Sequence, residues 1–221
     1  MLYVYAITES PARPHGLGLR SARLRVIGDE PPFAVVSDHD QSVEPGEEDL
    51  WAHERVVEDA MKMGAVLPFR FGTSVPDEAR LTGVLEERRR ELEVALRRVR
   101  GAVELGVRAH LRPRVRSNGD RLGERVPGPG TGYMLGRLAD ERQVADLIAR
   151  IHEPLATLAR RSARRPSSAG SGAFKAAYLV DRDRIEPFRR RVDELAEDVE
   201  GASVVCTGPW PPYSFTSGQE G

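Results

Sequence analysis

The order in which short apolar runs and longer amphipathic segments follow one another constrains the fold of this chain most. Runs such as LYVYAI at residues 2–7 and FAVVS at residues 33–37 are rich in β-branched and aromatic residues, which is typical of buried strands. Between such runs lie longer segments in which apolar residues recur at helical spacing. We expect strands at residues 2–7, 24–26, 33–37, 65–71, 103–111, 173–180 and 202–206, and helices at residues 49–63, 76–100, 133–164 and 183–200.

This alternation predicts an α+β protein of two domains, each with a small, mostly antiparallel sheet covered on one face by helices in a ferredoxin-like manner. A new unit begins at Gly101, directly after the long predicted helix. We therefore place an N-terminal domain at residues 1–100, a C-terminal domain at residues 101–215 and a flexible polar tail at residues 216–221. Prolines and glycines make the segment 112–130 a predicted loop.

The balance of charges argues against a chain that is drawn as a whole to nucleic acid or to an anionic membrane. The sequence has 33 basic and 34 acidic side chains, which leaves a formal net charge of -1. No run approaches the roughly 18 apolar residues of a membrane helix, and the N-terminus lacks the features of a signal peptide. Cys206 is the only cysteine, so no disulfide can form within the chain. We expect a soluble, cytoplasmic protein.

The sequence contains no pattern typical of catalysis, cofactor binding or metal binding. Two His-Glu pairs, His53-Glu54 and His152-Glu153, fall on predicted helices, where adjacent side chains point about 100° apart and cannot act as a unit. We expect His53 to be a packed or surface residue, with a partner contact as the first alternative and acid-base or metal chemistry as the second. The glycines at 128–136 follow a loop, not the strand that a dinucleotide fingerprint needs. We therefore predict no catalytic residues, cofactors or metal ligands, and a protein that is not an enzyme.

Arginine is concentrated at residues 88–90, 108–125 and 160–165. A basic groove on a small sheet would be typical of an Arg-rich RNA-binding module. Such modules stack bases on exposed aromatic side chains, whereas aromatics make up only 6% of this chain and mostly lie in apolar runs. We therefore interpret these arginines as solvated helix faces and keep RNA binding as the alternative function.

The stretch VLPFRFGT at residues 66–73 joins two predicted helices and contains the first group of candidate site residues. Pro68 lacks a backbone donor, which places this strand at a sheet edge or at a bulge. Strand alternation would put Leu67, Phe69 and Phe71 on one face and Arg70 on the other. We interpret the stretch as a structural link first. Phe69, Arg70 and Phe71 are the alternative, as an edge that binds a partner.

A second candidate segment is WPPYSF at residues 210–215, in which three aromatic residues alternate with prolines. Prolines prevent a regular helix here and stiffen the backbone. The segment is expected either to pack back on the body of the protein or to present an aromatic surface for protein binding. In the second case Trp210, Tyr213 and Phe215 are the candidate contact residues, because Trp and Tyr are common interface anchors.

Four segments together resemble a known family. They are LYVYAIT at residues 2–8, HERVVEDAMKMGAVLPFRFGT at residues 53–73, HEPLATLA at residues 152–159 and GPWPPYSF at residues 208–215. In this order, across almost the whole chain, they are similar to the GvpL/GvpF family of gas vesicle accessory proteins.

The resemblance implies two α/β domains, the second of them ferredoxin-like, and a minor accessory protein that is required for building gas vesicles. Such proteins are thought to bind the small hydrophobic shell protein and other accessory proteins, and the family has no established catalytic residues. The expected function is therefore that of a non-enzymatic assembly factor during vesicle nucleation and growth. We expect it to be cytoplasmic and associated with gas vesicles, with neither nucleic acid nor membrane lipid as a partner.

Overall fold

The computed structural model describes residues 1–11, 13–40, 46–111, 142, 145–165, 173–199 and 202–216. Several predicted segments lie outside the described residues. They are the loops at 112–130 and 166–172, residues 133–141, 143 and 144 of the predicted helix 133–164, and residues 217–221 of the tail.

The chain forms two compact units that differ from the predicted domains at both ends of the second domain. The first unit contains residues 1–104 and 209–221, and the second contains residues 105–208. The sequence placed the first boundary at Gly101 and assigned residues 209–215 to the second domain. These residues belong to the first unit because their side chains bind there, as the hydrogen bond from Tyr213 to Glu54 shows.

The first unit is built on a sheet whose central strand is the predicted N-terminal strand. The strands of this sheet pair in the order β2-β3-β1-β4, and β5 also pairs with β1. Every pairing of β1 is antiparallel, and all seven of its residues are buried. The strands are β1 (Leu2–Thr8), β2 (Leu24–Ile27), β3 (Phe33–Asp38), β4 (Val66–Pro68) and β5 (Ser74–Val75).

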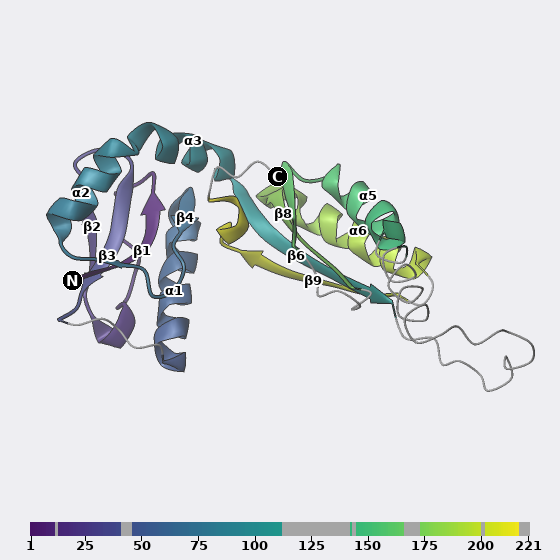
Figure 1. Ribbon diagram of the computed structural model, residues 1–221, viewed down its shortest axis with the longest axis horizontal. Coiled ribbons are helices and arrows are strands. Elements are labelled where there is room, and N and C mark those ends of the chain that lie inside the picture. Colours follow the sequence, from purple (N-terminus) through teal and green to yellow (C-terminus); the bar gives the residue numbers. More distant parts are fainter. Residues whose placement is uncertain are drawn as a thin grey trace, which may run out of the picture. The chain divides into compact units, whose positions relative to one another are not determined.

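Helices cover both faces of this sheet, so the prediction of helices on one face only is wrong for the first unit. Figure 1 shows α1 (Glu47–Met63) on one side of the sheet, and α2 (Glu78–Glu87) and α3 (Arg89–Val99) on the other. The reason is the composition of β1, whose residues from Leu2 to Ile7 are apolar or aromatic, so that both faces of the strand are removed from water.

A β-bulge in β1, between Val4 and Ala6, directs its side chains to both helix layers. Tyr5 is the residue at the shift in register, and it stacks on His53 of α1 with ring centroids 5.6 Å apart. Ile7 follows the shift and lines a cavity beside α3. Strict alternation would have placed Tyr5 and Ile7 on the same face.

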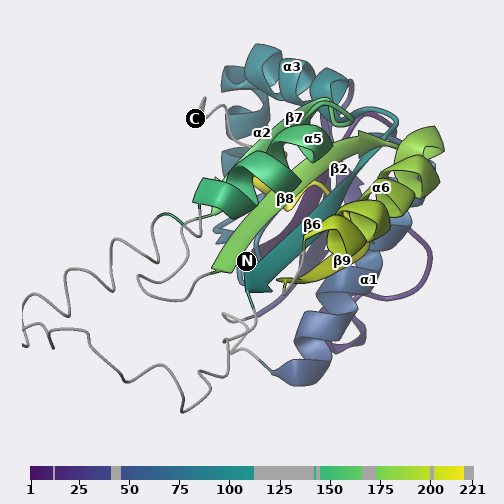
Figure 2. The same ribbon diagram turned by 90° about the vertical axis from the view of Figure 1, so that its right-hand side faces the viewer.

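The second unit is a ferredoxin-like α+β sandwich, as predicted. Its four strands lie in the order β7-β8-β6-β9, which is the strand order of a β-α-β-β-α-β unit whose first and third strands are central. Figures 1 and 2 both show its helices on the same face of the sheet. The elements are β6 (Ala102–Leu111), the π-helix η2 (Ile148–His152), α5 (Glu153–Ala156), β7 (Arg161–Arg165), β8 (Ala173–Asp181), α6 (Ile185–Asp198) and β9 (Ala202–Trp210).

The core of the second unit lies between the sheet and these helices. Every second residue of the two central strands points into it, as expected for a sheet with one covered face. His152 of η2 joins the two layers, because its Nδ1 lies 2.7 Å from the buried hydroxyl of Tyr178 on β8. The buried core residues are Leu105, Val107, Ala109, Leu147, Ile151, Leu155, Phe174, Ala176, Tyr178, Val180, Phe188, Val192, Leu195 and Val199.

The prediction of a helix through residue 164 is wrong at its end. Helical structure stops with α5 at Ala156, and Arg161–Arg165 forms the edge strand β7. Four of the five β7 side chains are exposed, so the sequence RSARR has no apolar alternation that would predict a strand. Pairing with β8 determines its conformation instead. The arginines of this group therefore lie on a strand and not on a solvated helix face.

The predicted helix 76–100 is divided into α2 and α3 at Arg88, whose backbone leaves the helical region with φ -103° and ψ 12°. Neither glycine nor proline marks this position. Both parts nevertheless bury residues of the predicted apolar stripe, such as Leu85 before the break and Leu96 after it.

Replacing Phe188 of α6 with alanine is expected to lower the free energy of unfolding by about 3–5 kcal/mol. Phe188 is 1% exposed, and its ring centroid lies 5.2 Å from that of Tyr178. Urea denaturation measures the change. Val205→Ala in the same unit is the matched control, because Val205 is 48% exposed and its truncation should cost less than about 0.5 kcal/mol. Equal losses in the two variants would contradict this packing.

Candidate partner-binding site

The stretch at residues 66–73 is a short edge strand followed by a tight turn. β4 ends at Pro68 and pairs only with β1, which confirms the edge position predicted from the proline. The amide of Phe69 still donates to the carbonyl of Tyr5, at 2.9 Å. The chain then turns: the amide and hydroxyl of Thr73 both donate to the carbonyl of Arg70, at 3.2 and 2.7 Å.

Because the strand ends at Pro68, the prediction that Leu67, Phe69 and Phe71 share one face is wrong for Phe71. Leu67 and Phe69 line a cavity beside α3. The ring of Phe71 instead lies against His53, on the α1 side, with centroids 5.8 Å apart. The turn at residues 70–73 therefore sends the two phenylalanines to opposite sides of the sheet.

His53 of α1 connects the central strand to this turn. Its Nε2 lies 3.1 Å from the carbonyl oxygen of Phe69, which can only accept, so Nε2 carries the proton. Its Nδ1 accepts from the hydroxyl of Tyr3, at 2.9 Å. The Tyr3 oxygen in turn accepts from the amide of Gly72, at 2.9 Å. His53 and Tyr3 together therefore hold both arms of the turn, and the sequence prediction of a packed histidine is consistent with this position.

Burial determines the protonation of this group of side chains. His53 is fully buried, and burial lowers its pKa to about 4, so the ring is neutral at pH 7. Burial also raises the pKa of Tyr3 to about 12 and raises the pKa of the Glu54 carboxyl. No group of three or more His, Cys, Asp or Glu side chains in the described parts of the chain is arranged to hold a metal ion.

The segment after Pro209 packs back on the first unit as a strap. The hydroxyl of Tyr213 donates to Glu54 at 3.0 Å. The amide and hydroxyl of Ser214 donate to the two carboxylate oxygens of Glu104, at 2.7 and 2.8 Å. Phe215 is 5% exposed, whereas Trp210 remains 44% exposed. Of the three aromatic candidates, Trp210 thus presents the most surface to a partner.

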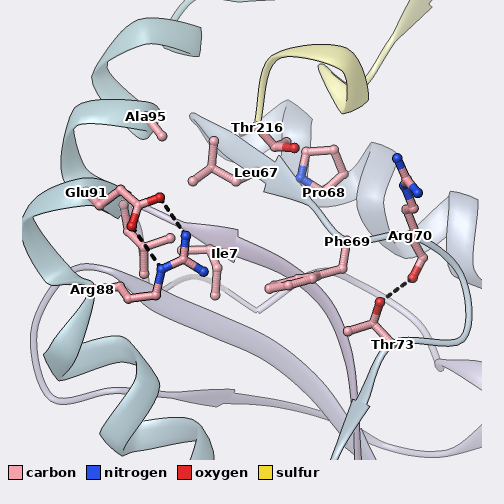
Figure 3. A pocket seen from close by; sticks show the side chains of 11 residues that line it. Ile7, Leu67, Pro68, Phe69, Arg70, Thr73, Arg88, Glu91, Ala95 and Thr216 are labelled. Atoms are coloured by element: carbon pink, nitrogen blue, oxygen red, sulfur yellow. Dashed lines mark hydrogen bonds and ion pairs between the residues drawn. The ribbon is translucent and has the colours of Figure 1, made fainter. Parts of the chain in front are cut away.

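A cavity of about 300 Å³ opens between β4, β1 and α3. Figure 3 shows Ile7, Leu67 and Phe69 around the same space, with Ala95 above it on α3. Its floor is therefore apolar. Thr216, the residue that follows the WPPYSF segment, lines its edge.

The rim of the cavity is charged. Arg88 binds Glu91 through two hydrogen bonds, at 2.9 and 2.5 Å, along the α3 side. Arg70 is exposed and lies on the opposite side of the cavity, where its side chain points away from Phe69 (Figure 3). The sequence identified Arg70 but assigned Arg88 and Glu91 to a solvated helix face. Their i,i+3 spacing predicts that the two side chains form an ion pair. It does not predict the cavity beside them.

No helix in the described ranges is both long and apolar enough to cross a membrane.

Acidification is expected to destabilise the protein through His53. Its pKa is about 4 in the folded state and about 6.5 when unfolded, so the unfolded state binds the proton more tightly. Stability from this group is present above pH 6.5 and is lost as the pH falls toward 4, by about 3 kcal/mol. Urea denaturation between pH 7.5 and pH 4.5 measures the slope.

The same titration of a His53→Gln variant isolates this contribution. The variant should be less stable at pH 7 and should lose less stability between pH 7.5 and pH 4.5 than the unmodified protein. Groups that do not contact His53 or share a partner with it, such as His152, titrate in both proteins and cancel in the comparison. Parallel curves for the two proteins would contradict a neutral, buried His53.

Comparison with known proteins agrees with the geometry of both units. The family model described as "Gas vesicle synthesis protein GvpL/GvpF" matches residues 1–217. Gas vesicle protein F of Streptomyces sp. (strain CB03234) is 31% identical, with 96% of this chain and 98% of that protein covered. Gas vesicle protein L of the same strain is also 31% identical, with 96% and 91% covered.

Two crystal structures share the fold. GvpF from Anabaena sp. PCC7120 superposes with a TM-score of 0.80 at 20% identity over 99% of both chains. GvpF from Microcystis aeruginosa superposes with a TM-score of 0.77 at 18% identity over 98% of both chains. The match of the family model over almost the whole sequence, together with these relatives, shows that the chain belongs to the GvpL/GvpF family of gas vesicle synthesis proteins.

Proposed function

We propose that this protein is a non-enzymatic assembly factor that binds the hydrophobic shell protein of gas vesicles, other accessory proteins, or both, during vesicle nucleation and growth. Membership of the family supports a gas vesicle accessory role. The observation that carries the binding proposal is the open cavity beside β4, with its apolar floor and charged rim. Under this proposal the protein acts in the cytoplasm, in association with gas vesicles.

The cavity suits one apolar side chain of a partner. An apolar shell subunit must be kept from uncontrolled association until it joins the growing shell, and an apolar pocket can cover one of its side chains. Leu67 and Phe69 would contact that side chain. The exposed guanidinium of Arg70 would bind a carbonyl or carboxylate of the partner at the rim.

The other candidate residues divide into two roles. Phe71, Tyr213 and Phe215 contact the interior of the first unit and therefore support the turn and the strap. Trp210 keeps 44% of its surface exposed, and we propose it as a second contact with accessory proteins.

The chemistry of the buried groups supports a role in binding and not in catalysis. His53 is neutral and fully hydrogen-bonded between Tyr3 and Phe69, so it has no free position for a substrate. Glu54 accepts a hydrogen bond from Tyr213. Both side chains of the pair His53-Glu54 thus form hydrogen bonds within the protein. Under this proposal neither of them acts as a general acid or base.

Arg70→Ala and Ala95→Leu are expected to weaken binding of the shell protein, and Arg70→Ala should do so without changing the melting temperature. The first removes the exposed charge at the rim. The second fills part of the cavity, since Ala95 lines it. Loss of one such contact typically weakens binding by roughly tenfold or more. Pull-down with purified shell protein, alone and with the other accessory proteins, measures the effect.

Arg90→Ala is the matched control, because Arg90 is exposed on α3, the helix that carries Ala95, and does not line the cavity. This variant should bind as the unmodified protein does. A lower melting temperature of Arg70→Ala would assign Arg70 a structural role. Unmodified protein that captures neither the shell protein nor an accessory protein, together with normal vesicles in a deletion strain, would refute the proposed function.

A further inference from the structure

In the described part of the second unit, the helices lie on one face of the sheet. Core residues such as Val107 of β6 and Tyr178 of β8 point toward α6 and its neighbours. The residues that alternate with the core residues along each strand point to the opposite face. Figure 2 shows α5 and α6 on the same side of β6, β8 and β9. In the described part of this unit, every buried helical side chain belongs to the core on that side.

The opposite face carries positive charges from three strands. Arg108 on β6 and Lys175 on β8 are exposed and out of phase with the core residues. On β7, Arg161 stands opposite Leu179 and Arg165 stands opposite Lys175, so both arginines share the face of Lys175. All four cations are exposed.

Carboxylates are scarce on this face. On the described strands of this sheet, two acidic side chains are in phase with the four cations. One is Glu104 of β6, which is 7% exposed and accepts two hydrogen bonds from Ser214. The other is Asp181. It lies at the end of β8 and forms an ion pair with Arg160. The described face is therefore basic although the whole chain has a formal net charge of -1.

An apolar side chain lies beside these charges. Val204 and Cys206 of β9 pack against the core, so Val205 points to the opposite face, where it is 48% exposed. The hydroxyl of Thr207 donates to the carbonyl of Gly106 at 3.3 Å. Since β6 and β9 run in opposite directions (Figure 1), Val205 lies next to Arg108.

We propose that this basic sheet face, formed by Arg108, Arg161, Arg165, Lys175 and Val205, is a docking surface for an extended acidic polypeptide segment of a partner protein. Alternate side chains of an extended chain repeat every 6–7 Å or so, which matches the spacing of side chains along a strand. Carboxylates at these positions would contact the cations, and an apolar residue between them would cover Val205.

Single-stranded RNA fits this face less well. RNA-binding sheets of this topology stack bases on exposed aromatic side chains. Within residues 105–208, the outward positions of the described strands hold no Phe, Tyr or Trp. Arg108, His110, Lys175 and Val205 are exposed there, whereas Ala177 and Leu179 are buried. An exposed valine beside the charges favours a polypeptide over a phosphate backbone.

The test measures fluorescence anisotropy of three labelled probes with the full-length protein: a twelve-residue peptide of alternating Glu and Val, the same peptide with Lys in place of Glu, and a twelve-nucleotide oligouridylate. The Glu-Val peptide is expected to bind, and its affinity should fall as salt rises. A variant with Arg108→Gln, Arg161→Gln and Lys175→Gln should bind it roughly tenfold more weakly. These side chains are exposed, so circular dichroism and melting temperature should be unchanged.

A variant with Arg164→Gln, Arg184→Gln and Arg190→Gln is the matched control. It removes the same charge from exposed positions of the same unit that do not face this side of the sheet. Retained binding in the control together with loss in the first variant supports the proposal. Equal losses, no binding of the Glu-Val peptide, or tighter binding of the oligouridylate would each overturn it. The cavity of the first unit is unaltered in both variants, so shell-protein capture reports on the proposed function separately.

Discussion

The hydrogen bonds of His53 determine how the first unit is assembled. One ring nitrogen binds Tyr3 on the central strand and the other binds the carbonyl of Phe69, so a single side chain of α1 connects the sheet to the turn after β4. A neutral imidazole can donate at one nitrogen and accept at the other, which is what these two partners require. Burial keeps the ring neutral, because it lowers the pKa of His53 to about 4.

The second unit repeats this arrangement with different surroundings. His152 lies on helical structure and its Nδ1 is 2.7 Å from the hydroxyl of Tyr178, a buried residue of a central strand. Burial lowers the pKa of His152 and raises that of Tyr178. In both units the His of a His-Glu pair thus binds the hydroxyl of a buried tyrosine. Leaving a buried hydroxyl proton without an acceptor costs about 1–3 kcal/mol. The two histidines therefore share a structural role, in which each one connects helical structure to a strand of the sheet.

The sequence predicted the elements whose apolar pattern is local and missed those that depend on distant partners. Apolar runs identified β1, β3 and β8, and Pro68 placed β4 at an edge, as the pairing confirms. In contrast, RSARR becomes a strand only through its pairing with β8. Phe71 departs from the predicted alternation because the chain turns after Pro68. Hydrogen bonds from this turn to His53 and Tyr3 hold the turn in place. The cavity could not be predicted at all, since Arg88, Ile7 and Thr216 are far apart in sequence.

The cavity lies between elements that the rest of the first unit holds in place. Its floor comes from β1 and β4, which hydrogen bonds join, and from the buried side of α3. The turn at its edge is held by His53 and by the double hydrogen bond from Thr73 to Arg70. A binding site on such fixed elements loses little conformational entropy when a partner binds. The hydrogen bonds of the turn therefore have a positioning role: they orient Phe69 toward the cavity and leave the charge of Arg70 at its rim.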